Sequence, residues 1–170
     1  RQTDQKIKPG KGPENGVALA VAEIPERGRS STIPMPITPK CAWALLQADS
    51  SARLIDTRST LEYIMVGHPV GAVHIPWMDE PDWVPDARFS ARIKDVFSSH
   101  ESVPVPGHAP PILLICRCGE RSSDAGKCLI DDGMANVYNV EGGFEGPLDD
   151  NRQRSTSSGW RFDGLPWQQY

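Results

Sequence analysis

Four consecutive apolar residues, Ile112–Ile115, stand directly before a short loop of polar residues. A short apolar run that is bounded by loop residues is typical of a strand buried on both faces, as in a parallel sheet. Shorter apolar segments predict three further strands, over residues 53–57, 72–75 and 136–140. The buried strand is therefore expected near the middle of a sheet, with the shorter strands beside it.

Between these strands the apolar positions change to the spacing of amphipathic helices. One such helix is predicted by Phe89, Ile93, Val96 and Phe97. Three other helices are predicted over residues 39–49, 60–65 and 122–132. Thr38 is expected to cap the first of these, and Ser122 or Ser123 the last.

Strands that alternate with helices predict an α/β fold. We expect a central, mostly parallel sheet of about five strands, with helices on both faces. Residues 1–36 are rich in Pro and Gly and are expected to form an extended N-terminal arm or leader. Residues 37–170 are expected to form one domain, closed by the aromatic residues of the segment 160–167.

The composition is that of a soluble globular protein, with 38% hydrophobic and 24% charged residues and a net charge of −4. The negative charge argues against nucleic acid as a partner, and no apolar run is long enough for a membrane span. Because the chain begins at Arg1 rather than Met, a removed export signal is one explanation. The compartment stays open between a bacterial-type cytoplasm and the periplasm.

The four cysteines are Cys41, Cys116, Cys118 and Cys128. They form no Cys-x-x-Cys pair, which argues against a disulfide framework and against a zinc site. We therefore expect no metal and no cofactor. Cys41 and Cys128 fall on the apolar faces of predicted helices and are expected to be packing residues.

Cys116 has a different setting, because it follows the buried strand directly and precedes the start of a predicted helix. In open parallel sheets, ligands bind at the carboxyl ends of the strands. A helix amino terminus supplies unpaired N–H groups and partial positive charge, which favour an anion. A free cysteine titrates near about 8.5, and such surroundings favour its reactive thiolate form. The sequence thus predicts a nucleophilic cysteine at this edge.

Four short segments of the sequence together form a recognisable pattern, in the order in which they occur along the chain. They are Leu54-Ile55-Asp56-Thr57-Arg58 with Glu62-Tyr63, Gly67-His68-Pro69-Val70-Gly71-Ala72 with Ile75-Pro76, Cys116-Arg117-Cys118-Gly119-Glu120-Arg121-Ser122, and Val137-Tyr138-Asn139-Val140 with Gly142-Gly143-Phe144. Together they resemble the signatures of a rhodanese domain over about residues 37–168. The resemblance implies a three-layer rhodanese-like fold.

The resemblance also implies a sulfurtransferase that needs no cofactor. In this family a cysteine takes a sulfane sulfur from a small anionic donor such as thiosulfate and holds it as a persulfide. The sulfur then passes to cyanide or a thiol, or to a sulfur-relay protein. On this basis Cys116 is the expected catalytic residue.

The loop after Cys116 is expected to bind the substrate through residues 117–122. Arg121, and also Arg117, would attract the anionic end of the donor. Gly119 would allow the tight curvature of the loop, and its successive N–H groups would form an anion nest. Glu120 departs from this pattern, and we expect it to point to solvent or to pair with Arg117. Ser122 completes the set.

Three charged residues in the first of the four segments are expected to be structural rather than catalytic: Asp56, Arg58 and Glu62. Asp56 would cap loop N–H groups, and Arg58 would pair with Glu62. His68 and His74 are also expected to be structural, because persulfide transfer requires no general base once the thiol is ionised.

Cys118 has two interpretations. It either fills space in the loop, or it attacks a persulfide on Cys116 and releases the sulfur. The first is favoured, because a disulfide across a single intervening residue would be strained.

Two other functions stay open. A phosphatase or arsenate reductase of the related fold would use a cysteine and an arginine, but only four residues separate Cys116 from Arg121 here, and phosphatase loops are longer. A sulfur-carrier or docking module would use the same domain with a protein partner. The acidic, Trp-containing loop 77–85 is a candidate surface for such a partner.

Overall fold

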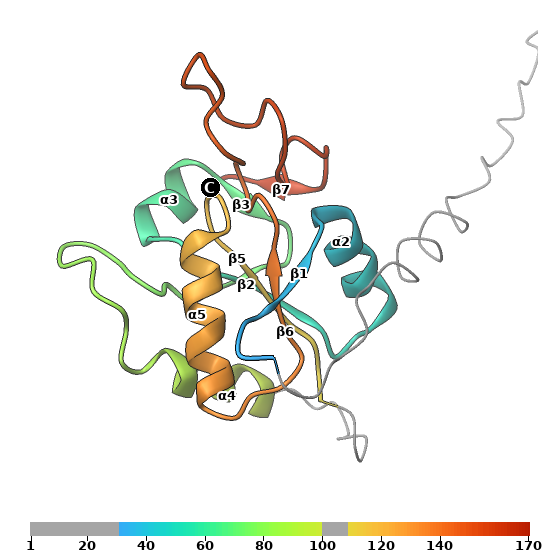
Figure 1. Ribbon diagram of the computed structural model, residues 1–170, viewed down its shortest axis with the longest axis vertical. Helices are drawn as coiled ribbons and strands as arrows, with labels where there is room; N and C mark the ends of the chain where they lie inside the picture. The colour runs from blue at the N-terminus through green and yellow to red at the C-terminus, as the bar shows by residue number, and fades with distance from the viewer. Residues whose placement is uncertain (1–30, 100–108) are drawn as a thin grey trace, which may run out of the picture.

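The structure is a computed structural model that describes residues 31–99 and 109–170 (Figure 1). Its centre is a parallel sheet of five strands in the order β1-β6-β5-β2-β4. The strands are β1 (Met35–Ile37), β2 (Arg53–Asp56), β4 (Val73–His74), β5 (Ile112–Ile115) and β6 (Val137–Val140). A second, two-stranded antiparallel sheet is formed by β3 (His68–Pro69) and β7 (Trp167–Gln168).

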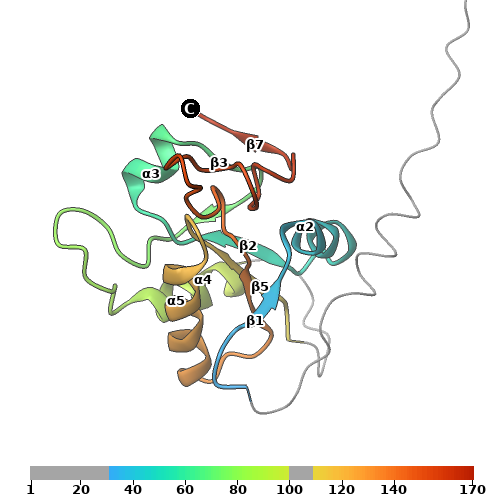
Figure 2. The ribbon, with the colours of Figure 1, turned by 45° about the horizontal axis from the view of Figure 1, so that its top comes forward.

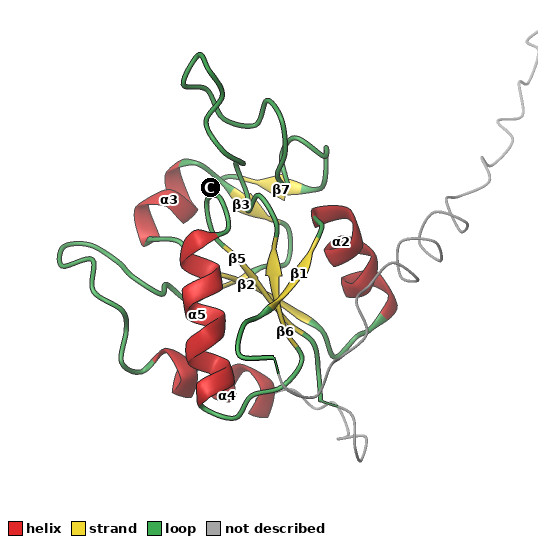
Figure 3. Cartoon of the chain, in the orientation of Figure 1, coloured by secondary structure: helices red, strands yellow, loops and turns green. Residues whose placement is uncertain are grey.

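The helices lie on both faces of the central sheet, as Figures 2 and 3 show. They are α2 (Pro39–Ala48), α3 (Thr60–Met65), α4 (Phe89–Ser98) and α5 (Glu120–Asp131). α2 packs on one face, and α4 and α5 pack on the other. α3 and the small sheet lie at the carboxyl ends of the strands. The predicted α/β fold with helices on both faces is therefore confirmed.

β5 explains why the apolar run is continuous. Leu113 and Ile115 join the core beneath α2, whereas Ile112 and Leu114 join the core beneath α4 and α5. Alternate side chains of a strand point to opposite faces, so a strand that is covered on both sides needs apolar residues at every position. All four side chains are buried, as the sequence predicts.

The first strand corrects the predicted domain boundary. Residues 35 and 36 were assigned to the arm, but β1 pairs in parallel with β6 and includes both. β1 is an edge strand, where the missing N–H of Pro36 is tolerated. A three-residue strand between prolines carries no periodic signal. Residues 1–30 of the expected arm lie outside the described residues, and residues 31–34 lead into β1 without regular secondary structure.

The start of α5 also differs from the prediction. The helix begins at Glu120 with Gly119 as its N-cap, not at Ser122 or Ser123. By contrast, Thr38 caps α2 as predicted, and its side chain accepts a hydrogen bond from the Cys41 amide (3.3 Å). The serine signal was misleading because Ser122 has a different hydrogen-bonding role.

The C-terminal segment completes the core beneath α2. Trp160 is fully buried, meets Trp43 edge to face, and donates a hydrogen bond from Nε1 to the Pro166 carbonyl oxygen (2.9 Å). The chain then returns as β7 to pair with β3. In the described part of the chain, no helix combines the length and the hydropathy required to cross a membrane.

We predict that Trp160→Ala lowers the free energy of unfolding by about 3–5 kcal/mol, because it removes a buried aromatic side chain and leaves a cavity. Urea denaturation would measure the loss. Trp167→Ala is the matched control, since Trp167 is 39% exposed and should cost clearly less. Equal losses in the two variants would contradict a role for Trp160 in the core.

Candidate active site

Cys116 lies where β5 ends, at the carboxyl edge of the sheet. Its residue is fully buried. The Gly119 amide donates a hydrogen bond to its Sγ over 3.1 Å. The sulfur therefore meets the loop amide that the sequence analysis expects, although no part of the residue reaches solvent.

Gly119 aims this amide by its backbone conformation. Its φ of 103° lies in the left-handed region, which L-residues with a side chain rarely adopt. A Cβ at this position would meet only ordinary contacts, so the constraint is the backbone angle rather than space. Because α5 begins at the next residue, the partial positive charge of a twelve-residue helix also lies beside the sulfur.

Ser122 connects the sulfur to a second polar group. Its Oγ lies 3.1 Å from Cys116 Sγ and 2.6 Å from Asn139 Oδ1. Asn139 Nδ2 donates to the Gly119 carbonyl oxygen (3.0 Å), which commits Oδ1 of the same side chain to Ser122. A hydroxyl carries one proton, so Ser122 donates to one of these two acceptors at a time.

The proton count gives Ser122 a different role in each ionisation state of Cys116. While the sulfur is a thiol, Ser122 can donate to Asn139 and accept from the S–H group. A thiolate is the stronger acceptor, because charge-assisted hydrogen bonds are stronger than neutral ones. Loss of the Cys116 proton therefore favours rotation of the Ser122 hydroxyl toward the sulfur.

The turn after β6 supports the loop from the other side. The amides of Phe144 and Glu145 donate to the carbonyl oxygens of Cys116 (2.8 Å) and Arg117 (2.9 Å). Gly143 allows this approach: its φ is 60°, and a Cβ there would collide with the Cys116 carbonyl oxygen and with the Arg117 backbone. The start of the loop is thus fixed by backbone contacts.

Arg121 does not face the loop as a free cation. Its Nη1 and Nη2 donate to the two carboxylate oxygens of Glu62, over 2.7 and 2.6 Å. Burial lowers the pKa of Arg121, but the hydrogen bonds and charge of Glu62, with smaller effects of charge on Cys116 and Cys118, raise it overall. For Glu62, burial alone would raise the pKa. The hydrogen bond and charge of Arg121, with smaller effects of the Ser59 amide and the charge of Arg58, lower the pKa of Glu62 overall.

Glu62 is itself positioned by a capping box. The Ser59 hydroxyl accepts from the Glu62 amide (3.3 Å), and the Ser59 amide donates to Glu62 Oε2 (3.2 Å). This arrangement satisfies two amides at the start of α3. The carboxylate therefore joins α3 to the first turn of α5.

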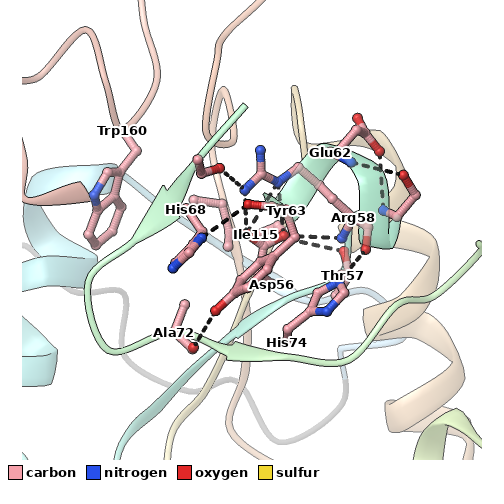
Figure 4. A network of polar contacts seen from close by, with 12 residues as sticks. Asp56, Thr57, Arg58, Glu62, Tyr63, His68, Ala72, His74, Ile115 and Trp160 are labelled. Atoms are coloured by element: carbon pink, nitrogen blue, oxygen red, sulfur yellow. Dashed lines mark hydrogen bonds and ion pairs between the residues drawn. The ribbon is translucent and has the colours of Figure 1, made fainter. Parts of the chain in front are cut away.

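Arg58 pairs with Asp56 and not with Glu62, so the predicted Arg58–Glu62 pair is wrong (Figure 4). Nη2 of Arg58 lies 2.6 Å from Asp56 Oδ2 and 2.7 Å from the Gly67 carbonyl oxygen, and both side chains are fully buried. The guanidinium carbon lies 4.3 Å from the centre of the Phe144 ring. Arg58 Nη1 has no hydrogen-bond partner among the described residues.

Two histidines enclose the Tyr63 ring. His68 stacks on it at 3.8 Å and His74 at 4.2 Å between ring centres. His68 Nδ1 contacts the Tyr63 carbonyl oxygen (3.1 Å), and His74 Nε2 contacts that of Arg58 (2.9 Å). Burial is the largest effect that raises the pKa of Tyr63 to about 12. His68 thus joins β3 to α3, and His74 joins β4 to the segment that follows β2.

The other predicted loop residues lie at the surface. Arg117 and Glu120 are exposed, and Cys118 is partly exposed. Two orientations were expected of Glu120: toward Arg117 or toward solvent. No ion pair joins Arg117 to Glu120 in the described chain, and Glu120 is exposed to solvent. Cys41 lies on the buried face of α2, and Cys128 Sγ lies 3.5 Å from Ser90 Oγ.

The sequence analysis assigned no role to Asn139, Gly143 or Phe144. All three belong to the last of the four sequence segments, so they were noticed as a motif but not as part of the site. The available signal was Asn139, a polar residue inside a predicted apolar strand. Its side chain lies on the face of β6 opposite the core beneath α2. Its partner Ser122 could not be identified without the pairing of β5 with β6.

The loop after β4 lines an open pocket of about 310 Å³, and Cys116 is not among the residues that line it. Thr60, His74, Trp77, Asp79 and Arg92 are among its lining residues. Asp79 binds the start of α3 by accepting from the Thr60 amide (2.9 Å) and hydroxyl (2.5 Å). The loop therefore supports α3, and through it Glu62.

Comparison with known families and proteins adds independent findings. Residues 38–148 match the sequence profile of the rhodanese-like domain. An uncharacterized protein of Rickettsia conorii is 30% identical over 127 residues, which cover 75% of this chain and 91% of that protein. The thiosulfate sulfurtransferase GlpE of Pseudomonas entomophila is 29% identical over 109 residues, covering 64% of this chain and 80% of the relative.

A solved structure agrees with the fold. The crystal structure of Rv0390 from M. tuberculosis superposes with a TM-score of 0.66 and 33% sequence identity. The match covers 79% of this chain and 97% of the other. The predicted rhodanese-like architecture is confirmed by this likeness together with the profile match.

We predict that Ser122→Ala slows alkylation of Cys116 by iodoacetamide at least about tenfold at fixed neutral pH. The variant removes a donor to the thiolate, and hydrogen bonds to charged groups contribute roughly 1.5–3 kcal/mol. Peptide mass mapping would follow Cys116 separately from the other cysteines. Ser123→Ala is the control, because the Ser123 side chain makes no hydrogen bond to the sulfur. Similar alkylation rates in the two variants would contradict the role of Ser122.

We also predict that the Glu62–Arg121 pair stabilises the fold in a pH-dependent manner. The pKa of Glu62 is lowered on folding, so its contribution is present above its ordinary value and is lost as the pH falls below about 4.5. The difference in unfolding free energy between the wild type and Glu62→Gln should therefore shrink on acidification. A difference that stays constant from pH 7 to pH 3 would contradict this prediction.

Proposed function

We propose, from the premise that this chain belongs to the rhodanese-like domain family, that it is a sulfurtransferase acting through a persulfide on Cys116. The observation that carries the proposal is the convergence of the Gly119 amide and the Ser122 hydroxyl on Cys116 Sγ. Both groups favour a negatively charged sulfur. The similarity to a thiosulfate sulfurtransferase supports the same reaction class.

In the first step, the Cys116 thiolate attacks the sulfane sulfur of a donor such as thiosulfate. A new S–S bond forms to Cys116, the S–S bond of thiosulfate breaks, and sulfite leaves with the electron pair of that bond. The protein then carries a persulfide anion. No oxidant is needed, because the sulfane sulfur is transferred together with its charge.

In the second step, an acceptor removes the terminal sulfur. Cyanide attacks it, the Cys116 S–S bond breaks, thiocyanate forms, and the thiolate is restored. A thiol acceptor would leave as its own persulfide. In both steps the helix amino terminus and the loop amides favour the anionic sulfur, which is the physical role we assign to residues 117–122.

The burial of Cys116 places one requirement on this reaction. Its residue has no exposed surface, so a donor reaches Sγ only after the atoms that cover it move aside. Cys118, Gly119 and Arg121 of the same loop are partly exposed, so the loop itself borders solvent.

A phosphatase is the less favoured alternative, and the arginine geometry argues against it. Catalysis on a phosphate monoester needs a guanidinium that binds the phosphoryl oxygens. Here Arg121 already binds both oxygens of Glu62. The short spacing of Cys116 and Arg121 points in the same direction.

A sulfur-carrier or docking module is the remaining alternative. A carrier would hold the same persulfide and receive its sulfur from a protein partner rather than from a small anion. Loop 77–85, with 46% of Trp83 exposed, is then the candidate contact surface. An enzyme would transfer sulfur from a small donor in the absence of any partner protein, whereas a carrier would not.

We predict that incubation with thiosulfate increases the intact mass of the protein by one sulfur atom, and that cyanide removes it. Cys116→Ala should abolish the gain while its circular dichroism spectrum stays that of the wild type. Hydrolysis of p-nitrophenyl phosphate, together with no mass gain, would favour the phosphatase. A mass gain in Cys116→Ala would refute the assignment of the nucleophile.

We further predict that Cys118→Ser releases persulfide sulfur to a dithiol at the wild-type rate. A disulfide between Cys116 and Cys118 would be strained, so Cys118 is not expected to displace the sulfur. The test starts from protein that is already persulfidated and follows hydrogen sulfide. A clear fall in the release rate would assign the resolving role to Cys118.

A further inference from the structure

Glu62 is the one carboxylate in ion-pair contact with the described active-site loop. It binds Arg121 through two hydrogen bonds, and only 16% of its own side chain and 17% of that of Arg121 are exposed. A two-point pair of this kind fixes the plane of the guanidinium as well as its position. The pair takes up one N–H group of each Nη atom and neutralises the guanidinium charge, so the attraction of Arg121 for an incoming anion is reduced.

Within the loop and its ion-pair partner Glu62, the charged side chains cancel. Arg117 and Arg121 contribute two positive charges, and Glu62 and Glu120 contribute two negative charges. The Cys116 thiolate adds one more negative charge. Apart from the backbone amides and the helix terminus, a donor meets a site with no excess of positive side chains.

We infer that Glu62 sets the charge selectivity of the site for sulfur donors by withholding the Arg121 guanidinium from them. The inference rests on the proposed sulfurtransferase function and specifies its substrate class. With Glu62 in place, the site gains little from a second negative charge on the donor. It then accepts monoanionic sulfane-sulfur donors nearly as well as dianionic ones.

A matched pair of donors isolates this effect. Thiosulfate is a dianion, and methanethiosulfonate is a monoanion in which a methyl group replaces one charged oxygen. The thiolate attacks the sulfane sulfur of either donor, the bond between the two sulfur atoms breaks, and sulfite or methanesulfinate leaves with the electron pair. The bond formed at Cys116 is the same, so the two reactions differ mainly in donor charge.

Glu62→Gln is the informative variant. The glutamine carbonyl can still accept from the Ser59 amide, which preserves the capping of α3, and it can still contact Arg121 once. The negative charge and one of the two hydrogen bonds are lost. Arg121 then has one more free N–H group and an uncompensated charge available for the donor.

We expect Glu62→Gln to raise the ratio of kcat/KM for thiosulfate to kcat/KM for methanethiosulfonate about tenfold over the wild type. The change should appear mainly as a lower KM for thiosulfate, because the freed guanidinium binds the donor before sulfur is transferred. A merely structural role of Glu62 would lower activity toward both donors by the same factor and leave the ratio unchanged.

Two further variants decide the origin of the effect. Glu141→Gln makes the same change in net charge at an exposed residue next to the Gly142 turn, beside Gly119, but does not contact Arg121. Its ratio should stay close to that of the wild type. In an Arg121→Gln background, Glu62→Gln should no longer change the ratio, because the guanidinium it would free is absent.

The outcomes separate this inference from the proposed function. If the wild type gains no sulfur from either donor in intact mass measurements, the proposed function fails. If it gains sulfur but Glu62→Gln leaves the donor ratio unchanged, the function stands and the selectivity role of Glu62 is overturned. An equal rise in the Glu141→Gln or the Arg121→Gln background would also overturn it.

Discussion

The parallel register of β2 and β5 is the constraint on which the site depends. Asp56 pairs with Ile115 in this register, so the two strands end at the same level. The amide of Thr57 continues the pairing by donating to the Ile115 carbonyl oxygen (2.8 Å). The chain segments that follow, one leading to α3 and one to α5, therefore start side by side. Without this register, Glu62 could not reach Arg121.

Around this edge, Arg58 and Arg121 each form an ion pair with a different carboxylate. Arg58 is fully buried and pairs with Asp56, while Arg121 is largely buried and pairs with Glu62. A buried charge is costly unless it is paired and hydrogen-bonded. The first pair joins β2 to Gly67 and the Phe144 ring, and the second joins α3 to α5. The charged side chains at this edge are thus neutralised, and the groups that contact the sulfur of Cys116, the proposed nucleophile, are a backbone N–H and one hydroxyl.

Much of the fold was predictable, because its elements carry local signals. The apolar run of β5, the Thr38–Pro39 start of α2 and the spacing of Phe89 and Ile93 each depend on neighbours in the sequence. The failures occur where local signals are weak or compete. β1 is too short and proline-rich to show a pattern, and Ser122 resembles an N-cap although Gly119 holds that position.

The sequence by itself determined that Cys116 follows a buried strand and precedes a helix, and that a glycine and two arginines stand in the loop between. These are properties of consecutive residues. Only the tertiary structure decided which groups meet the loop: Glu62 lies 59 positions from Arg121, and Asn139 lies 17 positions from Ser122. Such pairings depend on strand order, register and side-chain packing, which bring distant segments together and leave no periodic trace in either segment. For that physical reason Cys116 could be proposed as the nucleophile from the sequence, whereas the partner of Arg121 could not be identified.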